Sequence, residues 1–280
     1  MTGTTGATGR RFEELHRQDG AFVLANAWDA GTARLLAELG FAALGTTSAG
    51  LAHALGRPDG ANAVGRDETL ANAAAIAAAT ELPVSADLES GFGATPGEVA
   101  ETIRLAAAAG LAGGSVEDAT GRPGEPVRPL EEAAERVAAA AGAARSLPQP
   151  FVLTARAENF LHGRPDLEDT VRRLQAYEAA GADVLFAPGL PDAEAIRTVV
   201  GAVNRPVNVL MGGSGPRLST AELAALGVRR ISVGSALART ATAAVRDAAR
   251  EILTEGTFGF ARSAPTVRDV NAVMGQDRTA

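Results

Sequence analysis

The sequence contains no cysteine and no lysine, and these two absences narrow the chemistry that it can perform. Without cysteine there can be no disulfide, no Cys-ligated zinc site and no thiolate nucleophile. All 26 basic residues are arginine, so a Schiff base, the commonest covalent route for breaking a C–C bond beside a carbonyl in a barrel enzyme, is excluded. Only His16, His53 and His162 can titrate near neutral pH, and they are far apart in the sequence. If the chain is an enzyme, carboxylates and a hard metal ion must carry most of its chemistry.

Aromatic residues and positive charge are also scarce. With 4% aromatic residues and a net charge of -7, the chain has neither the basic surface nor the stacking side chains of a nucleic-acid-binding protein. No apolar run reaches the roughly 18 residues needed to span a membrane, and the opening MTGTTGATGRR lacks the apolar stretch of a signal peptide. We therefore expect a cytoplasmic protein without nucleic-acid or membrane partners.

The composition is otherwise that of a globular domain, with 46% hydrophobic and 21% charged residues. No Pro-, Gly- or Ser-rich linker divides the chain, so we expect residues 1–280 to form a single domain. Residues 2–9 are only Gly, Thr and Ala, a composition that buries too little surface to offset its ordering entropy. Residues 1–12 are thus predicted to be a flexible tail, and residues 256–280 a C-terminal extension.

Short apolar runs alternate with Ala-rich stretches of helical length, a pattern typical of βαβ units and a parallel sheet. Eight such pairs can be counted. The predicted strands are Phe22–Asn26, Ala42–Thr46, Pro83–Asp87, Gly113–Glu117, Phe151–Ala155, Asp183–Ala187, Pro206–Leu210 and Arg230–Val233. The predicted helices lie near 29–39, 66–80, 96–109, 129–146, 167–180, 192–202, 219–226 and 236–255.

Helix start and stop signals support these boundaries. Thr95 precedes a proline at the first position of a helix, and Gly110 follows the last. Gly40, Gly181 and Gly227 likewise stand between a helix and the next strand, so that one helix–Gly–strand unit recurs four times. The recurrence favours an α/β fold in which the strands close into a (β/α)8 TIM barrel over the alternative, a doubly wound sheet.

In such a barrel the active site lies at the C-terminal ends of the strands. Asp87 ends an apolar strand, Glu89 follows two residues later, and Glu117 ends the neighbouring strand. Three carboxylates at one barrel mouth repel one another unless a cation lies among them, and oxygen-only ligands favour Mg²⁺ or Mn²⁺. We therefore predict that Asp87, Glu89 and Glu117 are metal ligands. The alternative is that these acids pair with arginines around the rim.

Other polar residues at the same end are candidates for binding or catalysis. The planar guanidinium of Arg156 suits an anionic group, although Arg156 could instead be a structural partner of Glu117 or Glu158. The segment Ser48-Ala49-Gly50 offers a hydroxyl and backbone N–H groups to a carboxylate. Trp28 lies just past the first strand, where it can wall the pocket or pack at the rim, and His53 and Asp59 lie on the loop after the second strand. The candidate substrate-binding residues are Trp28, Ser48, Ala49, Gly50 and Arg156, and the candidate catalytic residues are Asp59, Glu117 and Arg156.

At these positions the chain resembles the phosphoenolpyruvate mutase/isocitrate lyase superfamily. The resemblance covers roughly residues 20–255 and rests on several short motifs in order: NAWDAGTARLLAELGF, SAGLA, ADLESGFG, SVEDATG and ARAENF. It implies a barrel, an Mg²⁺ ion and an enolate of a pyruvate-like or glyoxylate-like unit. It further implies that Asp87 is the direct metal ligand, that Glu89 and Glu117 act through waters, and that Ser48 to Gly50 with Arg156 hold the substrate.

The chain also departs from this family. The lyases that the resemblance includes carry a Lys-Lys-Cys-Gly-His-type loop after the fourth strand, where this chain has Ala119-Thr120-Gly121-Arg122-Pro123-Gly124. Thiol-dependent lyase chemistry is thereby excluded, and the mutases' Lys and Asn are also missing between residues 119 and 130. Glu89 stands where the second Asp of the metal motif is usual.

We therefore expect an Mg²⁺-dependent lyase or hydrolase that cleaves a C–C or C–P bond in a small 2-oxo or 2-hydroxy acid. A phosphonate or carboxyphosphonate mutase and a barrel that binds a 2-oxo acid without turnover are the alternatives. The resemblance also implies a homodimer or homotetramer in which the last helix, near 236–255, packs on a neighbouring subunit. Val245, Ala248, Ile252 and Leu253 would form its buried stripe. The alternative is that this stripe closes its own barrel.

Overall fold

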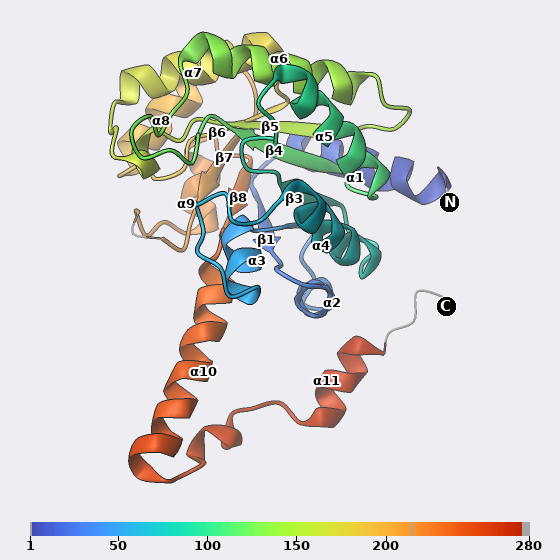
Figure 1. Ribbon diagram of the computed structural model, residues 1–280, viewed down its shortest axis with the longest axis vertical. Helices are drawn as coiled ribbons and strands as arrows, with labels where there is room; N and C mark the ends of the chain where they lie inside the picture. The colour runs from blue at the N-terminus through green and yellow to red at the C-terminus, as the bar shows by residue number, and fades with distance from the viewer. Residues whose placement is uncertain (1, 214, 276–280) are drawn as a thin grey trace.

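A computed structural model of the chain describes residues 2–213 and 215–275, and its strands close into a barrel (Figure 1). Every neighbouring pair of strands is parallel, and the first strand pairs with the last. The strands are β1 Phe22–Asn26, β2 Ala43–Gly45, β3 Val84–Asp87, β4 Gly113–Glu117, β5 Val152–Arg156, β6 Val184–Phe186, β7 Val207–Leu210 and β8 Arg230–Ser232. The predicted (β/α)8 barrel is confirmed.

Helices follow the strands as the alternating pattern predicted. They are α2 Ala30–Glu38, α4 Arg66–Ala78, α5 Pro96–Ala108, α6 Leu130–Arg145, α7 Leu167–Ala180, α8 Ala193–Ala202, α9 Thr220–Ala225 and α10 Ala236–Glu255. The Thr95 side chain accepts a hydrogen bond from the Glu98 N–H at the start of α5. Gly110 and Gly181 have φ of 89° and 103°, a left-handed conformation that glycine adopts easily at the end of a helix. None of the described helices is long and apolar enough to cross a membrane.

The structure adds helices that the alternating pattern did not predict: α1 Thr2–Arg17, α3 Ser48–Ala54, α11 Val267–Met274 and the short 3-10 turns η1 Asn159–His162 and η2 Gly259–Arg262. Residues 2–12, which the sequence predicts to be part of a flexible tail, lie in α1; Met1 is outside the described residues. Phe12 is fully buried with Leu24, Ala43 and Val152 near the starts of the strands. This packing offsets the low helix propensity of the Gly- and Thr-rich segment before it.

His16, also on α1, is buried at the same end of the barrel. Its Nδ1 lies 2.7 Å from the carbonyl oxygen of Phe12, and its Nε2 lies 3.3 Å from Nη1 of Arg230. Because arginine can only donate, Nε2 is the acceptor and Nδ1 carries the proton of a neutral ring. Burial, together with the charge of Arg230, lowers the pKa of His16 from 6.5 to about 3.

This shift predicts a loss of stability in mild acid. In the unfolded chain His16 binds a proton below pH 6.5, whereas in the folded chain it stays neutral down to about pH 3. The buried neutral ring therefore makes its full contribution to the free energy of unfolding above pH 6.5, and this contribution is lost as the pH falls. Between pH 7 and pH 5 we expect the free energy of unfolding to fall by about 2 kcal/mol more in the wild type than in His16→Gln. Urea titrations of both proteins at the two pH values measure this difference. An equal fall in the free energy of unfolding for the wild type and His16→Gln would contradict it.

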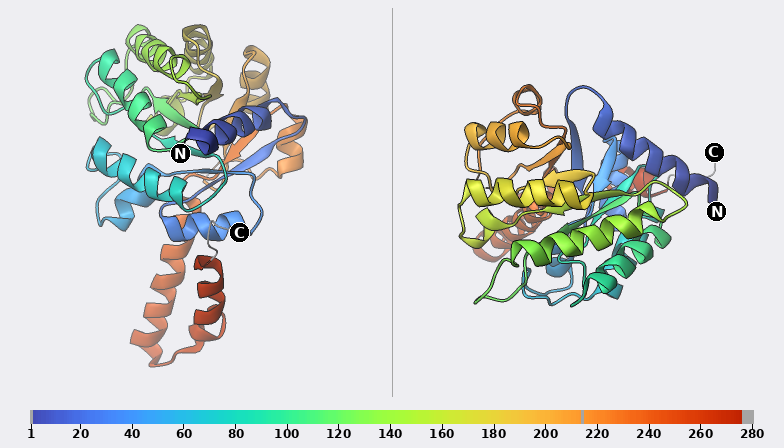
Figure 2. Two further views of the ribbon diagram at one scale, coloured as in Figure 1. Left: turned by 90° about the vertical axis from the view of Figure 1, so that its right-hand side faces the viewer. Right: turned by 90° about the horizontal axis from the view of Figure 1, so that it is seen from above.

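The C-terminal helix α10 does not return to its own barrel. Ala238, near its start, is its one buried residue among those described, and α10, η2 and α11 project from the barrel as an arm (Figures 1 and 2). The arm meets the barrel again at α2, where Arg34 Nη1 donates to the Met274 carbonyl oxygen at 2.7 Å. The alternative in which the stripe of α10 closes its own barrel is therefore wrong: within the single chain Val245, Ile252 and Leu253 are exposed.

Candidate active site

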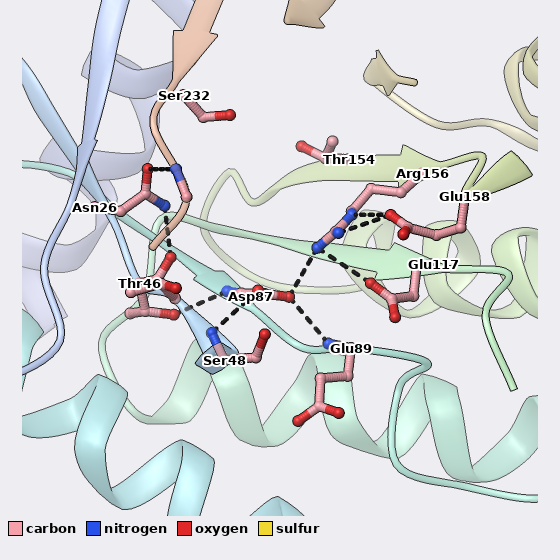
Figure 3. Close-up of polar contacts among 12 residues, drawn as sticks. Asn26, Thr46, Ser48, Asp87, Glu89, Glu117, Thr154, Arg156, Glu158 and Ser232 are labelled. Atoms are coloured by element: carbon pink, nitrogen blue, oxygen red, sulfur yellow. Dashed lines mark hydrogen bonds and ion pairs between the residues drawn. The ribbon is translucent and has the colours of Figure 1, made fainter. Parts of the chain in front are cut away.

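Asp87 lies at the C-terminal end of β3 and organises the polar residues around it. Its backbone N–H donates to Thr46 Oγ1 at 2.9 Å, which fixes the strand end against the chain after β2. Its carboxylate accepts hydrogen bonds from two backbone N–H groups, that of Ser48 on Oδ2 at 3.1 Å and that of Glu89 on Oδ1 at 3.3 Å. The carboxylate is thus held in one orientation before any ligand arrives (Figure 3).

Arg156, at the end of β5, lies among three carboxylates. Its Nη1 is 3.0 Å from Asp87 Oδ1 and 3.1 Å from Glu117 Oε2, while Nε and Nη2 donate to Glu158 Oε1 at 2.9 and 2.7 Å. The guanidinium also lies over the ring of Phe186 at 5.1 Å. The alternative to metal binding that the sequence allows is that the acids at the mouth pair with arginines. In this structure Asp87 and Glu117 do pair with Arg156 (Figure 3). Three of the five N–H groups donate to Asp87 and Glu158 and Nη1 also pairs with Glu117, so at most two N–H groups remain for a substrate.

The site carries more acidic than basic groups. Five carboxyl groups line its two adjoining cavities: Asp59, Asp87, Glu89, Glu117 and Glu158. Burial and the charge of Asp87 raise the pKa of Glu89 to about 7 and raise the pKa of Asp59 as well. Burial likewise raises the pKa of Glu117, although Arg156 opposes the rise. These shifts are the response expected of acids crowded together without enough positive charge.

Glu89 differs in conformation from the prediction. The two-residue spacing would put Asp87 and Glu89 on one face if the chain stayed extended, but β3 ends at Asp87 and Glu89 has φ of 46°. This left-handed backbone, unusual for a residue other than glycine, directs the Glu89 N–H at Asp87 and its carboxylate away from Asp87 (Figure 3). No hydrogen bond to the Glu89 carboxylate occurs among the described residues.

The donor set suits a hard divalent cation by its chemistry. Carboxylate oxygens are the ligands that Mg²⁺ prefers, and the excess of acidic groups would favour a cation at the mouth. Among residues 2–213 and 215–275, however, no three or more His, Asp or Glu side chains are arranged to hold a metal directly. The described residues therefore do not form a closed cage, and an ion at the mouth would keep several water ligands.

The predicted Ser48-Ala49-Gly50 turn is the first turn of helix α3, capped by Thr47. The Gly50 N–H donates to Thr47 Oγ1 at 3.2 Å, so Gly50 shapes this turn and is buried beside Trp28. A Cβ added at Gly50 would lie 2.9 Å from the Trp28 Cβ. Ser48 and Ala49 line the first cavity, whereas Trp28 and Gly50 line neither.

The two acids at the end of β4 have opposite environments. Glu117 faces the mouth, whereas the neighbouring Asp118 is buried outside the barrel wall. Asp118 accepts hydrogen bonds from the Glu158 N–H at 2.8 Å and the Tyr177 hydroxyl at 2.6 Å, and it pairs with Arg173 at 3.1 Å. These contacts hold β5 and α7 against β4, so the role of Asp118 is structural.

The loop after β4 supplies little chemistry. Ala119 and Gly121 line the second cavity, and Arg122 pairs with Glu125 at 2.7 Å on the exposed side. Asp59 and His162 lie across the same cavity, which has a volume of about 240 Å³. A carboxyl group and an imidazole thus reach this cavity from the segments after β2 and β5.

Sequence reasoning assigned no functional task to several residues that line the site. Asn26 Oδ1 accepts from the N–H groups of Val233 and Gly234 at 3.0 and 2.9 Å, and its amide donates to the Thr46 carbonyl at 2.6 Å, which joins β1, β2 and β8 at the mouth. Glu158 holds Arg156, and Asn208 and Arg230 line the cavity from β7 and β8. Polar residues at alternate positions of apolar strands were the available signal.

Comparisons with known proteins agree with this geometry. The phosphoenolpyruvate phosphomutase family model matches residues 12–253. An uncharacterized protein of Mycobacterium tuberculosis is 34% identical over 86% of this chain and 88% of its own, and an oxaloacetate decarboxylase of Chromohalobacter salexigens is 31% identical over 86% and 83%.

Solved structures give the same result. A candidate lyase/mutase of Burkholderia cenocepacia is similar with a TM-score of 0.93 and 56% identity over 96% of each chain. A phosphonopyruvate hydrolase solved with oxalate and Mg²⁺ is similar with a TM-score of 0.86 and 26% identity over 96% of this chain and 95% of its own. The chain therefore belongs to the phosphoenolpyruvate mutase/isocitrate lyase superfamily of lyases, mutases and hydrolases.

Proposed function

We propose that this enzyme is an Mg²⁺-dependent (or Mn²⁺-dependent) lyase or hydrolase that cleaves a C–C or C–P bond in a small 2-oxo or 2-hydroxy acid. The observation that carries the proposal is the arrangement at the barrel mouth, where Asp87 is oriented by two backbone N–H groups beside Arg156 and an excess of carboxyls. The family of the chain supports the same class of bond cleavage.

Asp87 would hold the metal directly, with Glu89 and Glu117 on its water ligands. When bound, such an ion stabilises the negative charge that develops on the substrate oxygen as the bond beside the carbonyl breaks. The Ser48 hydroxyl and the backbone at Ala49 would bind the substrate carboxylate, and Arg156 would offer its two remaining N–H groups. These residues orient the acid so that the breaking bond faces the second cavity.

Proton transfer needs a group from another segment, because Ala119 and Gly121 are the residues of the loop after β4 that line the second cavity and Glu125 pairs with Arg122 on the exposed side. We assign it to Asp59, whose raised pKa, caused by burial and by the charge of Asp87, keeps a proton available closer to neutral pH than an ordinary aspartate would. Asp59 lines both cavities, so it can serve a bond that breaks between them. The proton donor thus comes from the loop after β2.

A substrate screen tests the function. The purified protein with Mg²⁺ is incubated with small 2-oxo and 2-hydroxy acids and phosphonates, and the release of pyruvate, oxalate and phosphate is followed. We expect turnover of at least one acid that stops when EDTA removes the metal and is at least 100-fold slower in Asp59→Asn. Turnover that is unchanged by EDTA would contradict the proposal, and binding without turnover would favour a barrel that only holds its ligand.

Arg156→Lys should weaken the binding of oxalate or pyruvate although it preserves the charge. A lysine ammonium cannot hold Asp87, Glu117 and Glu158 together and still present a planar pair of N–H groups. The expected loss is about 1.5–3 kcal/mol of binding free energy, the range for hydrogen bonds to charged groups. Calorimetric titration measures it, with the exposed Arg197→Lys as the matched control. An affinity equal to the wild type would show that Arg156 is purely structural.

We also propose that the chain forms a homodimer or homotetramer in which α10 packs on a second copy. Large apolar side chains are exposed along the arm: Val245, Ile252, Leu253, Phe258, Phe260, Val267, Val270 and Met274. A surface of this kind is unusual for a monomer and typical of an interface. In the described part of the chain, in turn, no eighth helix packs beside α9 and α2 on the barrel.

A further inference from the structure

The interior of the barrel below the mouth is hollow and polar, although branched apolar side chains usually fill this position. Four inward-facing residues from different strands are small: Gly45, Ser85, Ser115 and Ser232. They line a cavity of about 150 Å³ that also reaches Asp87 and Arg156. The cavity therefore connects the site to the lumen of the barrel.

Arg230 lines the same cavity from the first position of β8 and is only 2% exposed. Its Nε donates to Asn208 Oδ1 at 2.9 Å, its Nη2 donates to Thr154 Oγ1 at 2.9 Å, and its Nη1 lies 3.3 Å from His16 Nε2. These partners are an amide, a hydroxyl and a neutral imidazole. Two of the five N–H groups have no protein acceptor among the described residues.

The charge of Arg230 is also uncompensated. In the described part of the chain no carboxylate forms an ion pair with it, and burial followed by repulsion from Arg156 lowers the pKa of Arg230 to about 9. A group with that pKa is still a cation at neutral pH. A buried cation without a counter-ion is strongly unfavourable, and a bound anion would remove the penalty.

We infer that the lumen of the barrel binds a small monoanion, a carboxylate group or a halide ion, against Arg230. The guanidinium supplies the charge, and the serine hydroxyls supply further donors in a space too small for a bulky acid. Figure 3 shows the Ser232 and Thr154 hydroxyls turned toward each other within this part of the barrel. A single cation among neutral donors matches one negative charge. The site does not depend on which reaction occurs at the mouth.

The anion has two possible sources, and one set of titrations separates them. Chloride, oxalate and succinate are titrated into wild type, Arg230→Met and the exposed control Arg197→Met, with Mg²⁺ present and gluconate keeping the ionic strength constant. If the anion is a free ion, chloride raises the unfolding midpoint of the wild type and the control but not of Arg230→Met. If it is the far carboxylate of a bound diacid, Arg230→Met binds succinate at least tenfold more weakly and oxalate within twofold of the wild type.

Either result supports the site. Because the removal of a buried charge can also prevent folding, Ser85→Val provides a second test: it fills the lumen and leaves Arg230 in place. Ser85→Val should abolish the chloride effect or weaken succinate tenfold, as Arg230→Met does. The inference is overturned if Arg230→Met is at least as stable as the wild type at every chloride concentration and binds each of the three anions with the wild-type affinity. Arg230 would then be a buried structural residue only. The inference is also overturned if Ser85→Val binds like the wild type.

Discussion

Asp87→Ala is expected to abolish Mg²⁺ binding and to lower turnover at least 1,000-fold while the barrel stays folded. The variant removes the proposed direct ligand. Among the described residues Asp87 is the one of the three acids whose carboxylate is oriented by backbone N–H groups, and the Glu89 carboxylate points away from it. Asp87 is the end residue of its strand and is partly open to solvent, so its loss creates no cavity in the core. Calorimetric titration with Mg²⁺ measures the effect.

The exposed Asp67→Ala is the matched control for this experiment, since it removes an aspartate whose side chain is 95% exposed. Asp67→Ala should bind Mg²⁺ as the wild type does. If Asp87→Ala retained the wild-type Mg²⁺ affinity, the metal site would lie elsewhere and the assignment of Asp87 would be wrong.

Removal of residues 235–280 is expected to give insoluble protein. The deletion takes away α10, η2 and α11, and with them the contacts at Ala238 and Met274 that join the arm to the barrel. In the proposed oligomer it also uncovers the barrel surface that the α10 of a second copy protects. The soluble fraction of the deletion variant after expression tests the first statement. Light scattering of the full chain tests the oligomer, and a monodisperse monomer of 28.3 kDa at micromolar concentration would contradict it.

A point substitution separates assembly from folding. Leu253 is 85% exposed in the single chain, so Leu253→Arg should leave a monomer as stable as before, within about 0.5 kcal/mol. In the proposed oligomer the same substitution buries an unpaired charge and should dissociate it. Arg246→Glu, on the polar side of α10, is the control that should leave assembly unchanged.

The elements of the barrel could be predicted because their signals are local. Strands such as β1 and β4 have the predicted bounds, since an apolar run between a glycine and a helical stretch leaves few other possibilities. Helix α1 was missed because its stability comes from contacts of Phe12 with strands that are distant in sequence. The low helix propensity of residues 2–9 indicated the opposite.

The site could be predicted only in part for the same reason. That Asp87, Glu117 and Arg156 meet follows from strand order and period-2 alternation, and the structure brings them together. The positive φ of Glu89 has no sequence signal, because glutamate rarely adopts it. The capture of three Arg156 N–H groups by Asp87 and Glu158 depends on side-chain geometry that only a structure provides.

The central claim is that a divalent cation and a 2-oxo acid bind together at the Asp87–Arg156 site. Calorimetric titration of oxalate, with and without Mg²⁺, tests it most directly. We predict that Mg²⁺ strengthens oxalate binding at least tenfold, that oxalate strengthens Mg²⁺ binding by the same factor, and that Asp87→Ala removes the coupling. An oxalate affinity that is the same in Mg²⁺ and in EDTA would contradict the account.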